Sequence, residues 1–409
     1  DLTREIAAEA GLAVDEAAFH VEMTKQRERA RAERLAKDIS GWSADLFGEL
    51  TAEATRFDGY DMLSESAKVI ALSDGEELAD AIATDEAGES KDGVLVVLDR
   101  TPFYAEMGGQ VADHGYITNG DAKLKVTQVK KTPRGYFVHT CELLDGTIHV
   151  GDEVTAAVDT QRRMAICRNH TATHLLQKAL REVLGEHVHQ AGSYQDDKLT
   201  HFDFTHFSAV TPEELRKVED RVNEKIFEAL PVTIQNLPIE EAKKMGAMAL
   251  FGEKYGSVVR VVDAGGWSTE FCGGTHVTNT AQIGCFKILS ESSVAAGIRR
   301  IEATTAYGVL NLLDERTEQL AQTAVALKAN NLKDAPARAE ALTAELKETS
   351  KQLDILKAEM ASAKIDGLFE NAADIDGVRI VSAYLTGTGA DTLRDMVDKV
   401  RDKAPNAVT

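Results

Sequence analysis

Two pairs of potential metal ligands stand out in this sequence of 409 residues. His170 and His174 are four residues apart in a segment with a helical pattern, so both imidazoles lie on one helix face, one turn apart. Much later in the chain, Cys272 and His276 supply a thiolate and a third imidazole. Three nitrogens and one sulfur complete a tetrahedral ligand set for Zn²⁺. We therefore expect one zinc ion per chain.

Either pair alone would more often consist of ordinary surface or core residues that bind no metal. The two pairs together favour a metal site. Gly273-Gly274 lets the backbone turn sharply between the thiolate and the third imidazole. Cys141 and Cys285 lie in strand patterns and read as small buried apolar residues. Cys167 precedes the helical pair by one turn, so a metal role for it would be redundant.

The helical pair is not that of a zinc peptidase. Such a motif needs a glutamate directly after the first histidine as general base, and Thr171 stands there. A threonine hydroxyl cannot deprotonate water. The metal would therefore polarise or orient a substrate or its water.

Short strands separated by turns predict a small antiparallel barrel or sandwich at residues 45–160. Val94–Leu98 has the pattern of a buried strand and Lys123–Thr127 that of a half-buried one. Asn119–Asp121 and Leu144–Thr147 have hairpin-turn composition, because Asn, Asp and Gly accept positive φ angles at little cost.

A mixed α and β pattern follows at residues 161–305. Thr211 and Pro212 make a clear helix start, with a capping hydroxyl and a proline at the first position. The expected helices and strands are Arg168–Leu184, Thr211–Leu230, Ser257–Val262 and Gly284–Ser290.

Helical patterns lie on both sides of these segments. Residues 1–44 are rich in Ala, Glu and Arg. Between 306 and 365 leucines recur at spacings of three and four, the seam of a coiled coil, and Asn330–Pro336 divides it into an antiparallel hairpin. One strand and one helix follow from 366, too few to bury a core, so we expect a small α/β domain that continues beyond Thr409.

Composition narrows the function classes. The chain is 43% hydrophobic and has no apolar run long enough to span a bilayer, which argues against a membrane protein. Four cysteines without a signal peptide favour the reducing cytoplasm. It begins at Asp1 rather than Met, so we expect a cut from a longer protein. The net charge of -21 opposes DNA and generic polyanion binding, and leaves only local basic clusters for RNA. Those clusters are Lys130–Arg134, Arg162–Arg168, Lys243–Lys244 and Arg299–Arg300.

The two ligand segments, Arg168–Leu176 and Phe271–His276, resemble the editing domain of alanyl-tRNA synthetases. Leu98–Gln110 resembles the family's barrel signature, with Met107 where the family has Ser. Further matching stretches are His189–Ser193 and Ala296–Glu302. The likeness covers nearly the whole chain in the family's order.

The resemblance implies an α+β multidomain chain that hydrolyses tRNA for alanine mischarged with Ser or Gly. The ATP- and Mg²⁺-dependent catalytic domain would precede residue 1, and we find no segment that resembles a class II synthetase core. A homodimer would form through the C-terminal domain. The implied parts are a segment of the preceding tRNA-binding helical domain at 1–44, a β-barrel at 45–160, a zinc-dependent editing core at 161–305, a helical hairpin at 306–365 and an α/β domain at 366–409.

Editing is needed because one methylene or hydroxyl changes binding too little to sort small amino acids in a single site. Thr173 and Gln190 are our candidates to read the Ser hydroxyl. The backbone N–H groups of Gly273-Gly274 are expected to stabilise the oxyanion. Arg299 and Arg300 are expected to hold phosphate or the tRNA end.

Four alternatives stay open on the sequence. The chain could be a freestanding trans-editing deacylase, or a threonyl-type synthetase that shares this module. Four protein ligands also suit a purely structural zinc in a tRNA-binding module. A coiled-coil scaffold explains 308–364 and nothing else.

Overall fold

The computed structural model describes residue 18 and residues 46–48, 50–84, 89–245, 256–370, 372–384, 389–405 and 407–408. The chain divides into two compact units, Asp1–Asn311 and Leu312–Thr409. The helix expected at residues 1–44 lies outside the described residues, except that residue 18 is helical. Among the described helices none is both long and apolar enough to cross a membrane.

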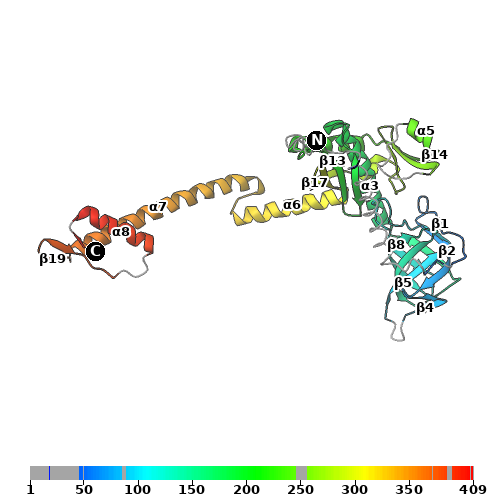
Figure 1. The fold of residues 1–409 in the computed structure, drawn as a ribbon, viewed down its shortest axis with the longest axis horizontal. Helices are drawn as coiled ribbons and strands as arrows, with labels where there is room; N and C mark the ends of the chain where they lie inside the picture. Colours follow the sequence, from blue (N-terminus) through cyan, green and yellow to red (C-terminus); the bar gives the residue numbers. More distant parts are fainter. Residues whose placement is uncertain are drawn as a thin grey trace. The chain divides into compact units, whose positions relative to one another are not determined.

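Six antiparallel strands form a closed barrel in the first unit (Figure 1). The ring runs β11-β7-β8-β9-β5-β2, and β2 pairs again with β11. Its strands are β2 (Ser64–Ser73), β5 (Lys91–Leu98), β7 (Gly115–Thr118), β8 (Lys123–Lys131), β9 (Phe137–Asp145) and β11 (Glu153–Val158). The two strands predicted in this region fall within β5 and β8, and Gly120 and Gly146 have the positive φ angles expected at the turns.

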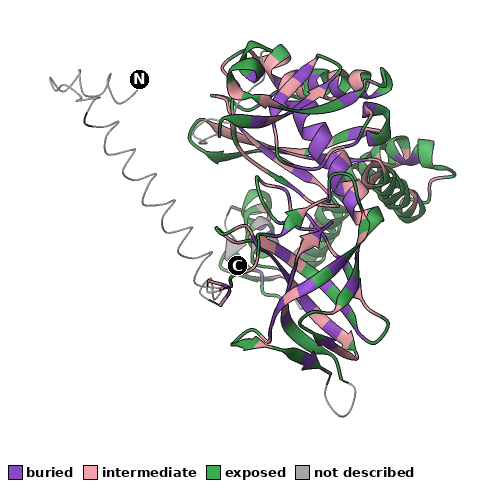
Figure 2. Cartoon of the chain, turned by 90° about the vertical axis from the view of Figure 1, so that its right-hand side faces the viewer, coloured by how far each residue is buried: buried purple, intermediate pink, exposed green. Residues whose placement is uncertain are grey.

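Alternating burial explains why these segments close into a barrel. Along β8, exposed Lys123 and Lys125 alternate with Leu124 and Val126, which are fully buried. Figure 2 shows the same alternation on neighbouring strands. Short strands attach to the barrel: β1 (Arg56–Phe57), β3 (Leu78–Ala79), β4 (Ala81–Ala83), β6 (Arg100–Thr101) and β10 (Thr147–His149).

A long buried helix and a four-stranded sheet make the second part of this unit. The helix α3 (Thr160–Leu184) packs on the sheet β12-β13-β18-β17 and on α4. The remaining bounds are β12 (Gln190–Gln195), β13 (Thr200–Thr205), β17 (Phe286–Ala295), β18 (Ile298–Thr305) and α4 (Pro212–Phe227).

Local chemistry sets where these elements begin and end. The helix predicted from Arg168 begins eight residues earlier, at Thr160, because the carboxylate of Asp159 accepts the N–H of Arg162 as an N-cap. Thr211 caps α4 as expected, with a complete capping box. That helix ends at Phe227, before the predicted Leu230, and Ala229 then takes a positive φ of 54°.

A smaller three-stranded sheet, β14-β15-β16, carries the chain to the second ligand pair. Its elements are β14 (Val232–Pro238), α5 (Ile239–Lys244), β15 (Val258–Ala264) and β16 (Ser268–Phe271). The 3₁₀ helix η1 (Thr280–Ile283) follows and ends at Gly284, whose φ is 82°. For that reason β17 begins at Phe286 and not at the predicted Gly284.

The second unit combines long helices with a small three-stranded sheet. The helix α6 (Tyr307–Ala326) runs into it and is followed by η2 (Leu332–Asp334) and α7 (Ala335–Glu370). The seam leucines are exposed, Leu313 by 62%, Leu346 by 71% and Leu356 by 56%, so the antiparallel coiled coil is not confirmed.

The end of α7 forms a small core with the elements after it. Ile365 packs with Val381 and with Met396 and Val400 of the last helix, so these parts of the chain bury a small cluster together. The last elements are β19 (Ala373–Ile375), β20 (Val378–Ile380), α8 (Ala390–Lys403) and β21 (Ala407–Val408).

Candidate metal centre

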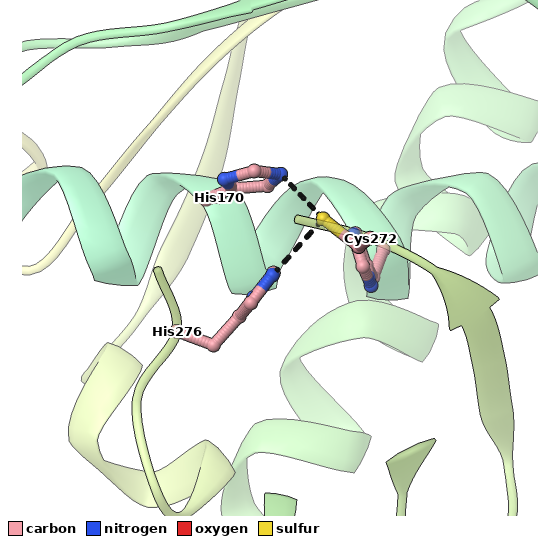
Figure 3. A group of neighbouring side chains, drawn as sticks. His170, Cys272 and His276 are labelled. Carbon is pink, nitrogen blue, oxygen red and sulfur yellow. Dashed lines mark hydrogen bonds between the residues drawn. The ribbon is translucent and has the colours of Figure 1, made fainter. Parts of the chain in front are cut away.

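The fold brings both predicted ligand pairs to one point. His170 and His174 lie on consecutive turns of α3, and Cys272 and His276 lie in the loop after β16. One ligand atom from each of the four lies within 4.8 Å of the others. Figure 3 shows Sγ of Cys272 between two imidazoles, 3.3 Å from Nε2 of His170 and 3.3 Å from Nε2 of His276.

These spacings fit a four-coordinate metal. Zinc binds thiolate sulfur at about 2.3 Å and imidazole nitrogen at about 2.0–2.1 Å, which in a tetrahedron places sulfur and nitrogen about 3.6 Å apart. The observed separations of 3.3 Å are close to that value. The donor set of three nitrogens and one sulfur is one that Zn²⁺ accepts. The cluster can therefore hold a metal ion.

A side chain of the barrel orients the first ligand. Oε1 of Gln110 accepts the backbone N–H of Thr275 at 2.8 Å, which identifies this atom as the amide oxygen. The same oxygen lies 2.8 Å from Nδ1 of His170, so Nδ1 carries a hydrogen and donates it. The lone pair of His170 is thereby left on Nε2, which faces the sulfur.

A hydroxyl orients the third imidazole in the same way. Thr171 donates its hydroxyl hydrogen to the carbonyl oxygen of Cys167 at 2.8 Å. Its oxygen is therefore an acceptor for Nδ1–H of His276, 3.1 Å away, which leaves Nε2 of His276 for a metal. Thr171, which stands where a zinc peptidase would have its glutamate, thus orients His276.

Hydrogen bonds and one ring contact hold the ligand loop. Arg260 donates to the carbonyl oxygens of Cys272 and Gly274 at 2.7 and 2.9 Å. Tyr60 donates its hydroxyl hydrogen to the carbonyl oxygen of Gly273 at 2.6 Å. The guanidinium of Arg260 lies 4.0 Å from the centre of the Tyr60 ring. The backbone N–H of Gly274 points at Sγ of Cys272, 3.4 Å away.

Burial keeps the imidazoles neutral, which is the form that binds metals. It lowers the pKa of His170 and of His276 well below the ordinary value, and lowers the pKa of His174 to about 3. Burial also raises the pKa of Glu270 to about 8, and its carboxylate lies 3.7 Å from Nε2 of His174. Glu270 was not among the residues predicted from the sequence. Its place two residues before Cys272 in a strand was the available signal.

A cavity of about 220 Å³ opens beside the cluster. Thr173 and Gln190, the two predicted readers of a hydroxyl, both line it together with metal ligands. Thr173 donates to the carbonyl oxygen of Asn169 at 2.8 Å, and Nε2 of Gln190 donates to Oγ of Ser193 at 3.1 Å. Further residues that line it, for which we predicted no site role from the sequence, are Gly108, Gln177, Arg181, His189, Ser193, Gln195, Glu270 and Phe271.

The two predicted phosphate-binding arginines do not line this cavity. Arg299 forms an ion pair with Glu291, in which Nη2 of the arginine lies 2.7 Å from a carboxylate oxygen. Arg300 forms a two-bond ion pair with Asp203 at 2.7 and 2.8 Å. The two arginines are adjacent on β18, so their side chains leave opposite faces of the sheet.

The other cysteines stay outside the ligand cluster. Cys141 is buried in the barrel core. Cys167 is also buried, and its thiol donates to Oγ1 of Thr275 at 3.2 Å. Cys285 is half-buried.

Comparison with known proteins identifies the family. Residues 1–162 match the family of class II (A) tRNA synthetases. Residues 259–302, which contain Cys272 and His276, match the second additional domain of threonyl and alanyl tRNA synthetases.

Three curated relatives illustrate the likeness. The chain is 46% identical to the alanine–tRNA ligase of Acetivibrio thermocellus, 45% to that of Shouchella clausii and 43% to that of Bacillus subtilis. Each alignment covers 100% of this chain and 46% of the relative, so the chain spans about half the length of these proteins. The chain therefore belongs to the alanyl-tRNA synthetase family.

Proposed function

We propose that this chain hydrolyses the ester of tRNA for alanine that carries Ser or Gly, at a zinc site formed by His170, His174, Cys272 and His276. The main support for this proposal is the cavity. Residues of the proposed zinc site form part of its wall, and Thr173 lines the same small space. A small, partly enclosed site with several polar groups on its wall suits a short amino acid ester. Membership of the alanyl-tRNA synthetase family supports tRNA as the carrier of that ester.

When bound, zinc supplies a positive charge that polarises an ester carbonyl or a water molecule. The chain's own residues prepare the ligands for this. Gln110 and Thr171 each accept an Nδ1–H, so His170 and His276 are held with Nε2 unprotonated.

Selection against alanine needs more than size, because Gly is smaller than Ala and Ser is larger. Thr173 and Gln190 remain our candidates to read the Ser hydroxyl, since buried polar groups left unpaired by alanine would disfavour it. For the oxyanion, Gly273 is the better donor of the two glycines, because the N–H of Gly274 points at a sulfur atom.

The proposed phosphate role of Arg299 and Arg300 requires an exchange of partners. Each guanidinium is paired with a carboxylate, of Glu291 and of Asp203. A tRNA phosphate would have to replace one of these carboxylates. Loss of tRNA affinity in Arg300→Gln, with hydrolysis of a short aminoacyl ester unchanged, supports this role.

One observation favours a second function, a structural zinc in a tRNA-binding module. Four protein ligands fill a tetrahedral site and leave no position for water or substrate, which is the pattern of structural zinc. Activity of the zinc-loaded chain separates the two functions.

The test uses the whole chain, loaded with zinc and assayed for metal content. It is incubated with Ser-, Gly- and Ala-esters of the tRNA for alanine, and ester loss is followed over time. We expect faster release of Ser and Gly than of Ala. Cys272→Ala should abolish this release, and Cys285→Ala, the matched change of a half-buried cysteine outside the cluster, should preserve it. Zinc-loaded, folded protein that releases none of the three would support the structural role.

We also propose the division into functional parts given by the resemblance, with the editing core at 161–305 and a tRNA-binding and dimerising part from 306. The exposed leucines of α6 and α7, among them Leu313, Leu346 and Leu353, support an apolar contact there. Sedimentation equilibrium of the chain and of Leu346→Glu/Leu353→Glu tests dimerisation, which the double change should abolish.

A further inference from the structure

One side chain in the cavity has hydrogen-bonding capacity that the protein does not use. Gln195 is fully buried, and neither its amide oxygen nor its amide nitrogen has a hydrogen-bond partner. Among the described residues, the other buried side-chain atom in this state is Oε1 of Glu65. Buried amides are almost always paired, so an unpaired one needs an explanation.

The backbone holds Gln195 in place beside the cavity. Its N–H donates to the carbonyl oxygen of Gly109 at 2.9 Å, and its carbonyl accepts the N–H of Val111 at 3.1 Å. Side chains alternate along β12, so Ser193 and Gln195 share the face that lines the cavity, and Tyr194 on the other face is 40% exposed. The side chain of Gln195 is therefore fixed on the cavity side of the strand.

The other polar groups of the cavity already have partners. The hydroxyl of Thr173 donates to the carbonyl of Asn169 and lies 2.7 Å from Oγ1 of Thr200. Nε2 of Gln190 donates to Oγ of Ser193. Thr173 and Gln190, the two residues predicted from the sequence, thus already spend part of their hydrogen-bonding capacity within the protein. Gln195 offers both a donor and an acceptor.

The cavity limits what can pair with this amide. Its volume is about 220 Å³, which leaves room for a small acyl group. A primary hydroxyl is both a donor and an acceptor, and it can use both atoms of one amide. Among Ser, Gly and Ala, only the Ser side chain has such a group.

We propose that Gln195 is a specificity-determining residue whose amide binds the side-chain hydroxyl of a seryl ester. This inference rests on the proposed hydrolysis of mischarged tRNA. It adds to that function a residue that discriminates Ser from Gly after both have entered the cavity.

The first test compares two substrates in one variant. Gln195→Met keeps the length of the side chain and removes both polar atoms. We expect kcat/KM for the Ser ester to fall about ten- to a hundredfold, while kcat/KM for the Gly ester changes less than threefold. Gln128→Met, the same change on a barrel strand, should leave both values unchanged. Equal losses on the two esters would overturn the inference, because Gln195 would then contact a group common to both.

A binding measurement separates this inference from the proposed function. The probes are 3′-deoxy-3′-(L-seryl)aminoadenosine and its glycyl counterpart, whose amide bonds resist ester hydrolysis. The seryl probe should bind the wild-type chain at least tenfold more tightly, and Gln195→Met should bind the two probes equally. Selective binding without any ester release would refute the proposed hydrolysis and retain the role of Gln195. Equal binding of the two probes by the wild-type chain would refute that role.

Thermal unfolding excludes a purely structural account. Replacing an unpaired buried amide with an apolar side chain of similar shape removes an unmet polar group. The unfolding temperature of probe-free Gln195→Met should therefore equal or exceed that of the wild-type chain. A marked decrease would show that the amide serves the fold, and would overturn the inference.

Discussion

The amide oxygen of Gln110, on a loop of the barrel, lies 2.8 Å from Nδ1 of His170 on helix α3. The same amide forms two hydrogen bonds with Thr275, in the loop that carries Cys272 and His276. One barrel side chain thus connects both ligand segments. The barrel therefore helps to build the candidate metal centre, although none of the four clustered residues belongs to it.

Gln110→Leu should weaken zinc binding. The change removes the acceptor that fixes the tautomer of His170, and loss of such an outer partner typically lowers metal affinity about 10- to 100-fold. Competition with a chromophoric chelator measures the affinity. Gln128→Leu, an equivalent change on strand β8, should retain wild-type affinity. Equal affinities for the wild-type chain and Gln110→Leu would show that the ligand loop positions the metal without the barrel.

Two adjacent glycines provide a matched pair for the same assay. A Cβ at Gly274 would collide with the ring of His170 and press on Oε1 of Gln110, whereas a Cβ at Gly273 would find Cε of Met107 as its nearest neighbour at 3.9 Å. Gly274→Ala should therefore lose most of its zinc affinity, and Gly273→Ala should keep it. Similar losses in both variants would mean that backbone freedom, and not space at His170, explains the Gly-Gly sequence.

The sequence was sufficient to select the four residues that cluster, and insufficient for the side chains that support them. Ligand identity follows from residue types at short spacings, because two imidazoles one turn apart must share a helix face. The contact of Gln110 with His170 joins positions 60 residues apart, and no periodicity predicts such a pairing. Gln195 was missed for a related reason: its distinguishing feature is the absence of a partner, which only the packed structure can show.

The secondary structure was likewise predicted where the signal is local and missed where it depends on tertiary contacts. The strands at β5 and β8 were predicted because alternation or a continuous apolar run is a local signal. The first eight residues of α3 were missed because these two turns begin with polar residues, among them Arg162 and Arg163. Arg163 is nevertheless buried, and it is paired with Asp113 of the barrel. A tertiary ion pair therefore overrides the polar local sequence.

That ion pair gives a prediction on stability. Arg163 is 3% exposed, it donates to Asp113 and to the carbonyl oxygens of Gly59 and Pro102, and Asp113 also accepts the N–H of Tyr104. Arg163→Met would leave a buried carboxylate without its counter-charge and should lower the free energy of unfolding by about 3–5 kcal/mol. Urea unfolding followed by circular dichroism measures this.

The control removes both charges. Arg163→Met/Asp113→Leu no longer contains an isolated buried charge, so the double variant should recover part of the loss. A double variant that is less stable than Arg163→Met by the full cost of a second deletion would show that the two side chains act independently.

A buried histidine of the barrel should make stability depend on pH. His139 donates Nδ1–H to the carbonyl oxygen of Val96 at 3.0 Å, and its Nε2 lies 2.8 Å from the hydroxyl of Thr101, so the neutral ring is fully paired. Burial lowers the pKa of His139 to about 4. Between pH 6.5 and 4 the unfolded chain binds a proton at this residue that the native chain does not, so stability falls as the pH falls.

The expected size is about 2 kcal/mol of unfolding free energy lost between pH 7 and pH 5. His139→Gln can both donate and accept a hydrogen bond but does not titrate, so its loss over this interval should be smaller than that of the wild-type chain by this amount. Urea unfolding at the two pH values gives the comparison. His149→Gln, which changes a barrel histidine whose side chain is 57% exposed, is the control and should follow the wild-type chain. An equal loss in His139→Gln and in the wild-type chain would place the acid-sensitive group elsewhere, because no other titrating group differs between them.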